Sequence, residues 1–156
     1  MIVLARIDDR LIHGQVVVGW VNSVKTEQII VIDKDVAKDK DRQSFMKLAV
    51  PKKIKLSFFS PQEAGEALKN SQFLKSRILL LFSNPSDILP LIQSGVLLKE
   101  INIGGMRYSF GKKEIMKSVF ANKEDINALK LLSSLGVSLI ARAVPTDHPV
   151  DISKLI

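Results

Sequence analysis

Short apolar runs rich in Ile, Val and Leu recur along the chain, separated by amphipathic segments. Most of these runs are continuously apolar rather than alternating, which is typical of parallel strands covered on both faces of a sheet. The pattern predicts strands over Ile2–Ile7, Gln28–Ile32, Ile54–Phe59, Arg77–Phe82, Glu100–Ile103 and Val137–Ala143.

The helical spacing of apolar residues predicts the elements that cover such a sheet. A first helix is expected over Gly14–Val24, with Trp20 in its apolar core stripe. A second, charged helix is expected over residues 35–50, ending before Pro51, because proline disfavours a helical conformation in the residue before it. The apolar side of the second helix is predicted to consist of Phe45, Leu48 and Ala49.

Capping residues predict where later helices begin. Ser60-Pro61-Gln62-Glu63 and Asn84-Pro85-Ser86-Asp87 each place a capping side chain, a proline and an acidic residue in the order that starts a helix. These helices are expected to end near residues 69–70 and at Gly95, and a last helix is expected over residues 122–135.

The stretch 104–121 departs from this order, because it alternates around a glycine turn and predicts a hairpin or a long surface loop. Gly104-Gly105 is typical of a tight turn, with a backbone nest for an anion as the alternative. The order strand, helix, strand, helix predicts an α/β fold with a mainly parallel open sheet, helices on both faces, and an additional hairpin or antiparallel edge strand.

Length and composition narrow the class of protein. A chain of 156 residues with 46% apolar and 25% charged residues is expected to form a single domain, 1–156, with a packed core. It contains no Cys, so disulfides, thiolate metal sites and phosphocysteine chemistry are excluded. The N-terminal apolar run stops at Arg6, too early for a signal segment or a membrane span, so we expect a cytoplasmic protein.

The net charge of +7 favours anionic partners without choosing among them. Nucleic-acid binding is not expected, because the lysines are scattered and only one Tyr and one Trp could stack on bases. There is no Walker loop, no G-x-G-x-x-G motif and no metal-ligand spacing, so no metal or nucleotide cofactor is predicted.

Candidate chemistry gathers in the loop after the first strand, Asp8-Asp9-Arg10-Leu11-Ile12-His13-Gly14-Gln15. Ligands of open α/β sheets bind at this edge of the sheet, where strands end and helices begin. His13 can act as a neutral nucleophile near pH 7, and Arg10 offers a planar fork for phosphate oxygens. Gly14 and Gln15 open the helix, where free N–H groups and the helix dipole favour an anion.

The acidic residues of this loop would repel a phosphate if they faced it. Asp8 and Asp9 are therefore expected to pair with Arg10 or Arg6 and hold the loop in shape, and one of them could orient the imidazole. The alternatives are a solvated turn with a chance histidine, or a non-catalytic regulatory α/β domain that binds a small anion in the same crevice.

The run from Leu4 to Val16 resembles the start of the enzyme IIB component of the mannose/fructose/sorbose class of bacterial sugar phosphotransferase systems. The resemblance continues through Leu80–Pro85, Asn102–Met106 and Thr146-Asp147, and so covers essentially the whole chain. The family fold is also a mainly parallel α/β sheet with helices on both faces.

The resemblance implies that His13 is the phosphohistidine, phosphorylated at Nδ1, with Arg10 as the phosphate-stabilising arginine. Arg10, Gly14 and Gln15 are then the expected phosphate-binding residues, supported by Asp9 and Arg6. The implied partners are a separate enzyme IIA as phosphodonor, the membrane IIC/IID permease and the incoming sugar, with only peripheral association with the membrane subunits. The implied activity is that of a protein-N(pi)-phosphohistidine–sugar phosphotransferase.

Several other polar residues have ordinary structural explanations. Asn84 is assigned to helix capping, and Arg142 to pairing with an acidic neighbour. Arg107 and Tyr108 are expected in an exposed loop, where docking of IIA is the alternative. His148 is expected to be a surface residue.

Overall fold

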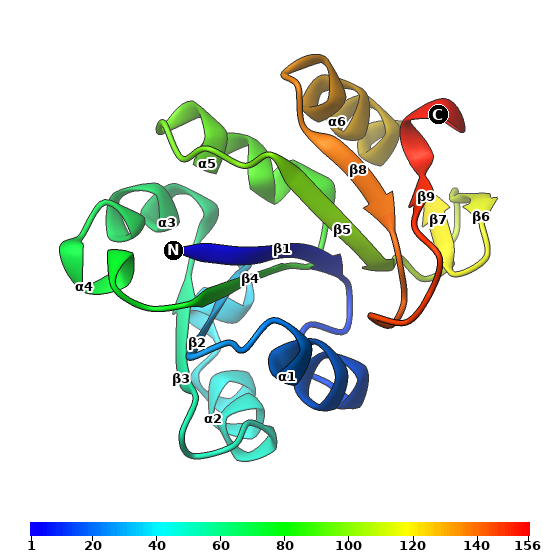
Figure 1. Cartoon of the computed structure of the whole chain (residues 1–156). Coiled ribbons are helices and arrows are strands. Elements are labelled where there is room, and N and C mark those ends of the chain that lie inside the picture. Colours follow the sequence, from blue (N-terminus) through cyan, green and yellow to red (C-terminus); the bar gives the residue numbers. More distant parts are fainter.

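The computed structural model describes the backbone of residues 1–156 and every side chain except those of residues 72 and 74. A seven-stranded sheet forms its centre, in the spatial order β3-β2-β4-β1-β5-β8-β9 (Figure 1). All neighbouring strands pair in parallel except β9, which is antiparallel to β8. The strands are β1 (Ile2–Asp8), β2 (Gln28–Ile32), β3 (Lys55–Phe59), β4 (Ile78–Phe82), β5 (Glu100–Gly105), β8 (Ser138–Ala141) and β9 (Val150–Asp151).

Two apolar clusters, one on each face of the sheet, form the core. The inner strand β4 is buried along its whole length, with Leu80 in one cluster and Leu79 and Leu81 in the other. One face is covered by a π-helical segment (Gln15–Trp20), α1 (Val21–Ser23) and α2 (Lys40–Ala49). The other face is covered by α3 (Pro61–Leu68), α4 (Ser71–Leu74), α5 (Leu89–Gln93) and α6 (Lys123–Ser134), the two groups lying on opposite sides of the sheet in Figure 1.

The α/β fold predicted from the apolar runs is confirmed, with both of the expected additions. A separate antiparallel hairpin pairs β6 (Lys113–Met116) with β7 (Val119–Ala121), and β9 adds the antiparallel edge strand. Gly104 and Gly105 do not form a tight turn, because both lie within β5.

The predicted helix starts are confirmed by their hydrogen bonds. Glu63 N–H donates to Ser60 Oγ at 3.3 Å, while Ser60 N–H donates back to a Glu63 carboxylate oxygen at 3.0 Å. Asn122 forms a second capping box at the start of α6. At Asn84 the side chain accepts the N–H of Asp87 at 3.1 Å, but a 3₁₀ turn (Pro85–Ile88) precedes α5.

The prediction of one continuous helix over residues 35–50 with an inward apolar side is wrong. A 3₁₀ turn (Val36–Lys38) ends at Asp39, whose extended backbone breaks the helix and whose side chain caps α2. Gln43 is the residue that α2 buries, because its amide donates to the carbonyls of that preceding turn. Phe45 and Leu48 consequently face outward and are 72% and 84% exposed.

The first covering helix is also irregular, since its opening part has π-helical hydrogen bonding before α1 continues it. Trp20 packs inward as predicted. Within the described part of the chain, no helix is both long and apolar enough to cross a lipid bilayer.

Candidate functional site

The candidate site is built on the turn between β1 and the π-helical segment. Asp8 is the last residue of β1, which lies between β4 and β5 in the sheet. Asp9 N–H donates to Gly105 O at 3.1 Å, and Leu11 N–H donates to Asp8 O at 2.8 Å, which fixes the turn against the end of β5. The loop predicted to carry the chemistry therefore starts from the middle of the sheet.

Leu11 holds the turn in an unusual backbone conformation. Its φ is 55°, in the left-handed region that a leucine rarely adopts, while its side chain is only 1% exposed. Such a conformation costs about 1 kcal/mol or more and persists only where the surroundings enforce it. Burial of the Leu11 side chain in the core thus stabilises the turn that presents the neighbouring polar groups.

Asp8 is the acceptor at the centre of the site, and its side chain is completely buried. One carboxylate oxygen, Oδ2, accepts from Arg6 Nη2 at 2.9 Å and lies 2.8 Å from His13 Nε2. The other oxygen, Oδ1, accepts the Arg10 N–H at 3.2 Å and lies 3.8 Å from Arg10 Nε. The Asp8 carboxylate therefore contacts the predicted nucleophile, His13, and two cationic residues, Arg6 and Arg10.

Arg6 holds the Asp8 carboxylate through the hydrogen bond to Oδ2 and is itself fully buried. Its guanidinium also donates to the side chain of Asn102 and to the carbonyls of Arg142 (2.9 Å) and Ala143 (3.0 Å). It lies 5.2 Å from the centre of the Trp20 ring, a cation–π contact. Burial lowers the pKa of Arg6 from its ordinary value, and the Asp8 carboxylate opposes that shift.

Gly104 makes room for the Arg6 guanidinium. A Cβ atom at Gly104 would overlap the guanidinium carbon and nitrogens of Arg6. The glycine is therefore required by the close approach of a buried cation to the backbone of β5, a reason that its sequence context alone does not reveal.

His13 presents Nε2 to the carboxylate, and its other ring nitrogen, Nδ1, has no hydrogen-bond partner among the described side chains. A carboxylate only accepts hydrogen bonds, so Nε2 carries the hydrogen and Nδ1 keeps its lone pair in the neutral ring. The side chain is 15% exposed, so it is held in position but is not sealed inside the protein. A fixed, accessible imidazole of this kind can act as a nucleophile.

The residues predicted to bind phosphate lie in the same loop and helix start as His13 and are exposed. The Arg10 side chain is 42% exposed and donates to Gln15 Oε1 at 3.1 Å. Gly14 is exposed, with no atom near the position of a Cβ. Val17 N–H donates to His13 O, so the N–H groups of Gly14, Gln15 and Val16 belong to the first turn.

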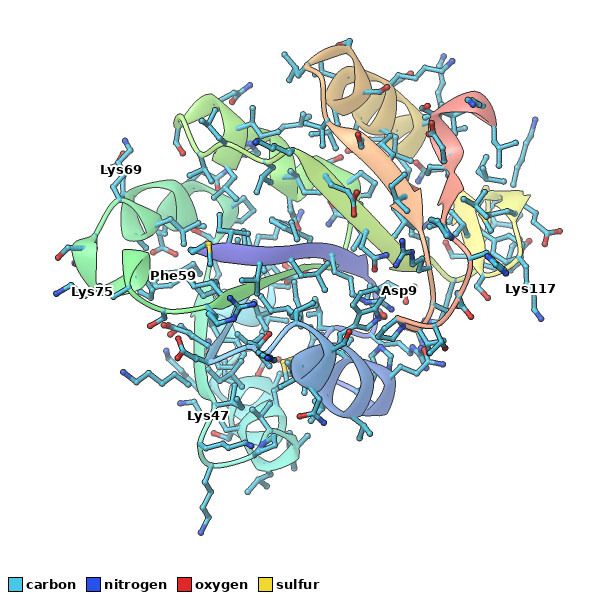
Figure 2. The ribbon with its side chains drawn as sticks, viewed as in Figure 1. Asp9, Lys47, Phe59, Lys69, Lys75 and Lys117 are labelled. Carbon is cyan, nitrogen blue, oxygen red and sulfur yellow. The ribbon has the colours of Figure 1, made fainter. Side chains whose placement is uncertain are left out.

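Asp9, which was expected to support the site, lies beside it and does not contact His13. Its carboxylate accepts the N–H and the Nε–H of Arg107, at 2.8 and 3.2 Å, and so ties the loop after β5 to the loop after β1. Figure 2 shows Asp9 at the carboxyl end of β1. Asp8, rather than Asp9, is the residue that orients the imidazole.

An open hollow of about 430 Å³ meets the site at Gln15 and Gly104. Gln15, Gly104, Lys117, Arg142 and His148 are among its lining residues. The predicted pairing of Arg142 with an acidic neighbour is not found, because Arg142 forms no ion pair with another described side chain. His148 is exposed as predicted, and no local motif indicates that folding brings Arg142 and His148 beside Gln15. The hollow is consequently bordered by two cations, Lys117 and Arg142, and by one carboxylate, Asp147.

Comparison with known proteins identifies the family to which the chain is similar. The family model for the PTS system sorbose subfamily IIB component matches residues 2–156. The fructose-specific EIIB component of Bacillus subtilis is 39% identical over 155 residues, which cover 99% of this chain and 95% of that protein. The crystal structure of the IIBSor domain of the sorbose permease from Klebsiella pneumoniae has a TM-score of 0.94 and 38% identity, covering 99% of this chain and 95% of that one.

The chain belongs to the sorbose subfamily of IIB components of the sugar phosphotransferase systems. The family resemblance inferred from the sequence is thus confirmed. A further relative, the mannose-specific EIIAB component of Escherichia coli, is 35% identical over 153 residues; these cover 98% of this chain but 47% of that protein.

Proposed function

We propose that this chain is a cytoplasmic phosphoryl carrier that receives a phosphoryl group from IIA on His13 Nδ1 and passes it to a sugar entering through the IIC/IID permease. Family membership places the chain among phosphotransferase components that serve sugar uptake. What we propose beyond family membership is that His13 carries the phosphoryl group and that IIA and the IIC/IID permease are the partners. Residues 1–156 are proposed to act as one IIB domain.

The observation that carries the proposal is the hydrogen bond between His13 Nε2 and the buried Asp8 carboxylate, at 2.8 Å. It fixes the ring and leaves Nδ1 as the nucleophilic nitrogen. As Nδ1 attacks phosphorus, positive charge develops on the imidazole, and the adjacent carboxylate stabilises that charge. The buried Arg6 keeps the carboxylate in place through its contact at 2.9 Å.

The transferred group itself needs cations and N–H donors around it, because its negative charge is spread over three oxygens. Arg10 is exposed enough to swing toward such a group and is anchored near it by Asp8 and Gln15. Gly14 and Gln15 contribute the N–H groups of the first helical turn. These are the roles proposed for Arg10, Gly14 and Gln15.

The chemistry consists of two in-line displacements. In the first, the bond from phosphorus to the IIA histidine breaks as the bond to His13 Nδ1 forms. In the second, a sugar hydroxyl attacks the same phosphorus, the N–P bond breaks, the hydroxyl releases its proton to water, and His13 returns to the neutral ring with the lone pair back on Nδ1. The hydrogen stays on Nε2 in both steps and is donated to the Asp8 carboxylate.

The partner assignments have their own support. The name of the mannose-specific EIIAB component joins IIA and IIB in one protein, and the match to this chain covers 47% of that protein. The net charge of +7 favours encounter with an acidic donor, an attraction that weakens as salt rises.

The test is phosphorylation by phosphoenolpyruvate, the general phosphotransferase proteins and IIA. Wild type is expected to acquire one acid-labile phosphoryl group, and His13→Gln is expected to acquire none while unfolding like wild type. His148→Gln is the matched control, because the chain has two histidines and His148 lies on the surface. Failure to label wild type would favour the non-catalytic anion-binding alternative, and labelling of His13→Gln would assign the phosphoryl group to another residue.

A further inference from the structure

The outward face of α2 carries two large apolar side chains that nothing covers. Phe45 and Leu48 are 72% and 84% exposed and stand three residues apart, so they lie on the same side of the helix. The helix is turned this way because it buries Gln43 instead. Their exposure is therefore a consequence of the packing of α2.

The chain from α2 to the start of β3 is basic, and its acidic residues, Asp39 and Asp41, lie at the beginning of α2. Residues 42–55 contain five basic residues and no acidic one, so this stretch contributes +5 to a net charge of +7. All five are exposed, and none forms an ion pair with another described side chain. The five residues are Arg42, Lys47, Lys52, Lys53 and Lys55.

We infer that this surface, the α2 patch (Arg42, Phe45, Lys47, Leu48, Lys52 and Lys53), binds the surface of an anionic phospholipid bilayer. A helix with an aromatic and an aliphatic side chain between lysines can bury its apolar groups at the level of the headgroups. The long lysine stems lie along the apolar layer while their ammonium groups contact lipid phosphates.

The composition of the α2 patch favours a bilayer over a protein partner. Protein interfaces are depleted in lysine and enriched in Tyr, Trp and Arg, whereas the α2 patch has three lysines and one arginine around two apolar side chains. Lysine clusters beside a small apolar surface are instead typical of proteins that bind acidic headgroups.

The position of the α2 patch leaves the proposed phosphorylation site accessible. In Figure 2, Lys47 on α2 and Asp9 at the carboxyl end of β1 lie in different parts of the molecule. Bilayer binding through α2 can therefore coexist with access of a partner to His13. The inference goes beyond the proposed function and does not depend on it, since lipid binding requires no phosphoryl transfer.

The experiment measures co-sedimentation of the full chain with protein-free vesicles of phosphatidylcholine, with and without phosphatidylglycerol. Wild type is expected to bind only the vesicles that contain phosphatidylglycerol, and binding should weaken as ionic strength rises from about 0.01 M to about 0.15 M. Lys52→Gln with Lys53→Gln should lower the partition coefficient about thirtyfold, at about fivefold for each charge. Phe45→Ser with Leu48→Ser should lower it at least about tenfold.

The matched control is Leu131→Ser with Leu135→Ser. These leucines of α6 and its end are 46% and 56% exposed, and α6 covers the opposite face of the sheet. The control should bind vesicles like wild type, and all variants should accept phosphoryl groups in solution at the wild-type rate.

Three results would overturn the inference. The first is that wild type does not bind phosphatidylglycerol vesicles at low salt. The second is that the α6 control loses as much vesicle binding as the α2 variants do. The third is that wild type binds native membranes but not protein-free vesicles. The last result would assign the α2 patch to a membrane protein. Because phosphorylation is measured separately, failure of lipid binding leaves the proposed carrier function standing.

Discussion

Replacing Asp8 by Asn keeps the shape of the side chain but removes the charge at the centre of the site. Both oxygens of Asp8 accept hydrogen bonds, Oδ2 from Arg6 and His13 and Oδ1 from the Arg10 N–H. An amide offers one acceptor oxygen in place of two. In either orientation, its NH₂ group faces a donor, so Asp8→Asn cannot restore the network.

The structure allows two magnitudes to be estimated. Arg6 is fully buried, and leaving a buried charge without its counter-ion costs about 3 to 5 kcal/mol of stability. Loss of the attraction between a carboxylate and the developing imidazolium costs up to about 4 kcal/mol at an effective dielectric of about 20, which corresponds to a transfer rate about 10² to 10³-fold lower.

The assays are urea unfolding and rapid-quench measurement of phosphoryl transfer from phosphorylated IIA. Asp9→Asn is the control, because Asp9 is the neighbouring carboxylate and contacts Arg107 rather than His13. It should lose less than about 1 kcal/mol, as expected for a partly exposed ion pair, and should transfer at nearly the wild-type rate. Transfer by folded Asp8→Asn within about threefold of wild type would refute the role assigned to Asp8.

Three further variants test separate parts of the structure. Gly104→Ala should displace the Arg6 guanidinium and destabilise the protein by about 3 kcal/mol or more in urea unfolding; an unchanged midpoint would contradict the close packing. Arg10→Lys should leave stability within about 0.5 kcal/mol of wild type but slow transfer at least about tenfold, because a lysine lacks the planar fork; equal rates would remove Arg10 from the phosphate site. Burial, reinforced by Asp33, raises the pKa of Asp87 to about 6 from 3.8, so ionisation of Asp87 opposes folding above about pH 6. Asp87→Asn should accordingly gain about 1 to 3 kcal/mol at pH 8, and the gain should fade from about pH 6 to pH 4; a pH-independent effect would be evidence against this origin.

The strands of the sheet were predictable because each is marked by a short apolar run of its own residues. β2 has the predicted bounds, and the ends of the other main strands lie within two residues of their predicted positions. Continuously apolar runs such as Ile78–Phe82 can be accommodated only in a strand covered on both faces. The orientation of α2 was not predictable, because Gln43 is polar and its burial depends on carbonyls of a turn that the sequence pattern does not reveal.

The candidate site also has one part that could be predicted from the sequence and one part that could not. His13, Arg10 and the helix start lie within one short loop, so their proximity follows from the sequence. The support beneath them does not, because Arg6 is held by Asn102 and by carbonyls of residues 142 and 143, more than ninety residues away. Nothing local distinguishes Asp8 from Asp9; the end of β1 and the close contact at Gly104 decide which carboxylate is buried.

The central claim is that the Asp8 hydrogen bond reserves His13 Nδ1 for the phosphoryl group. The most direct measurement is nitrogen-15 NMR of the phosphorylated protein labelled at histidine, which distinguishes phosphorylation at Nδ1 from phosphorylation at Nε2. We expect a single phosphohistidine, at position 13, with phosphorus on Nδ1 and a hydrogen on Nε2. Phosphorus on Nε2 of His13, or on His148, would contradict it.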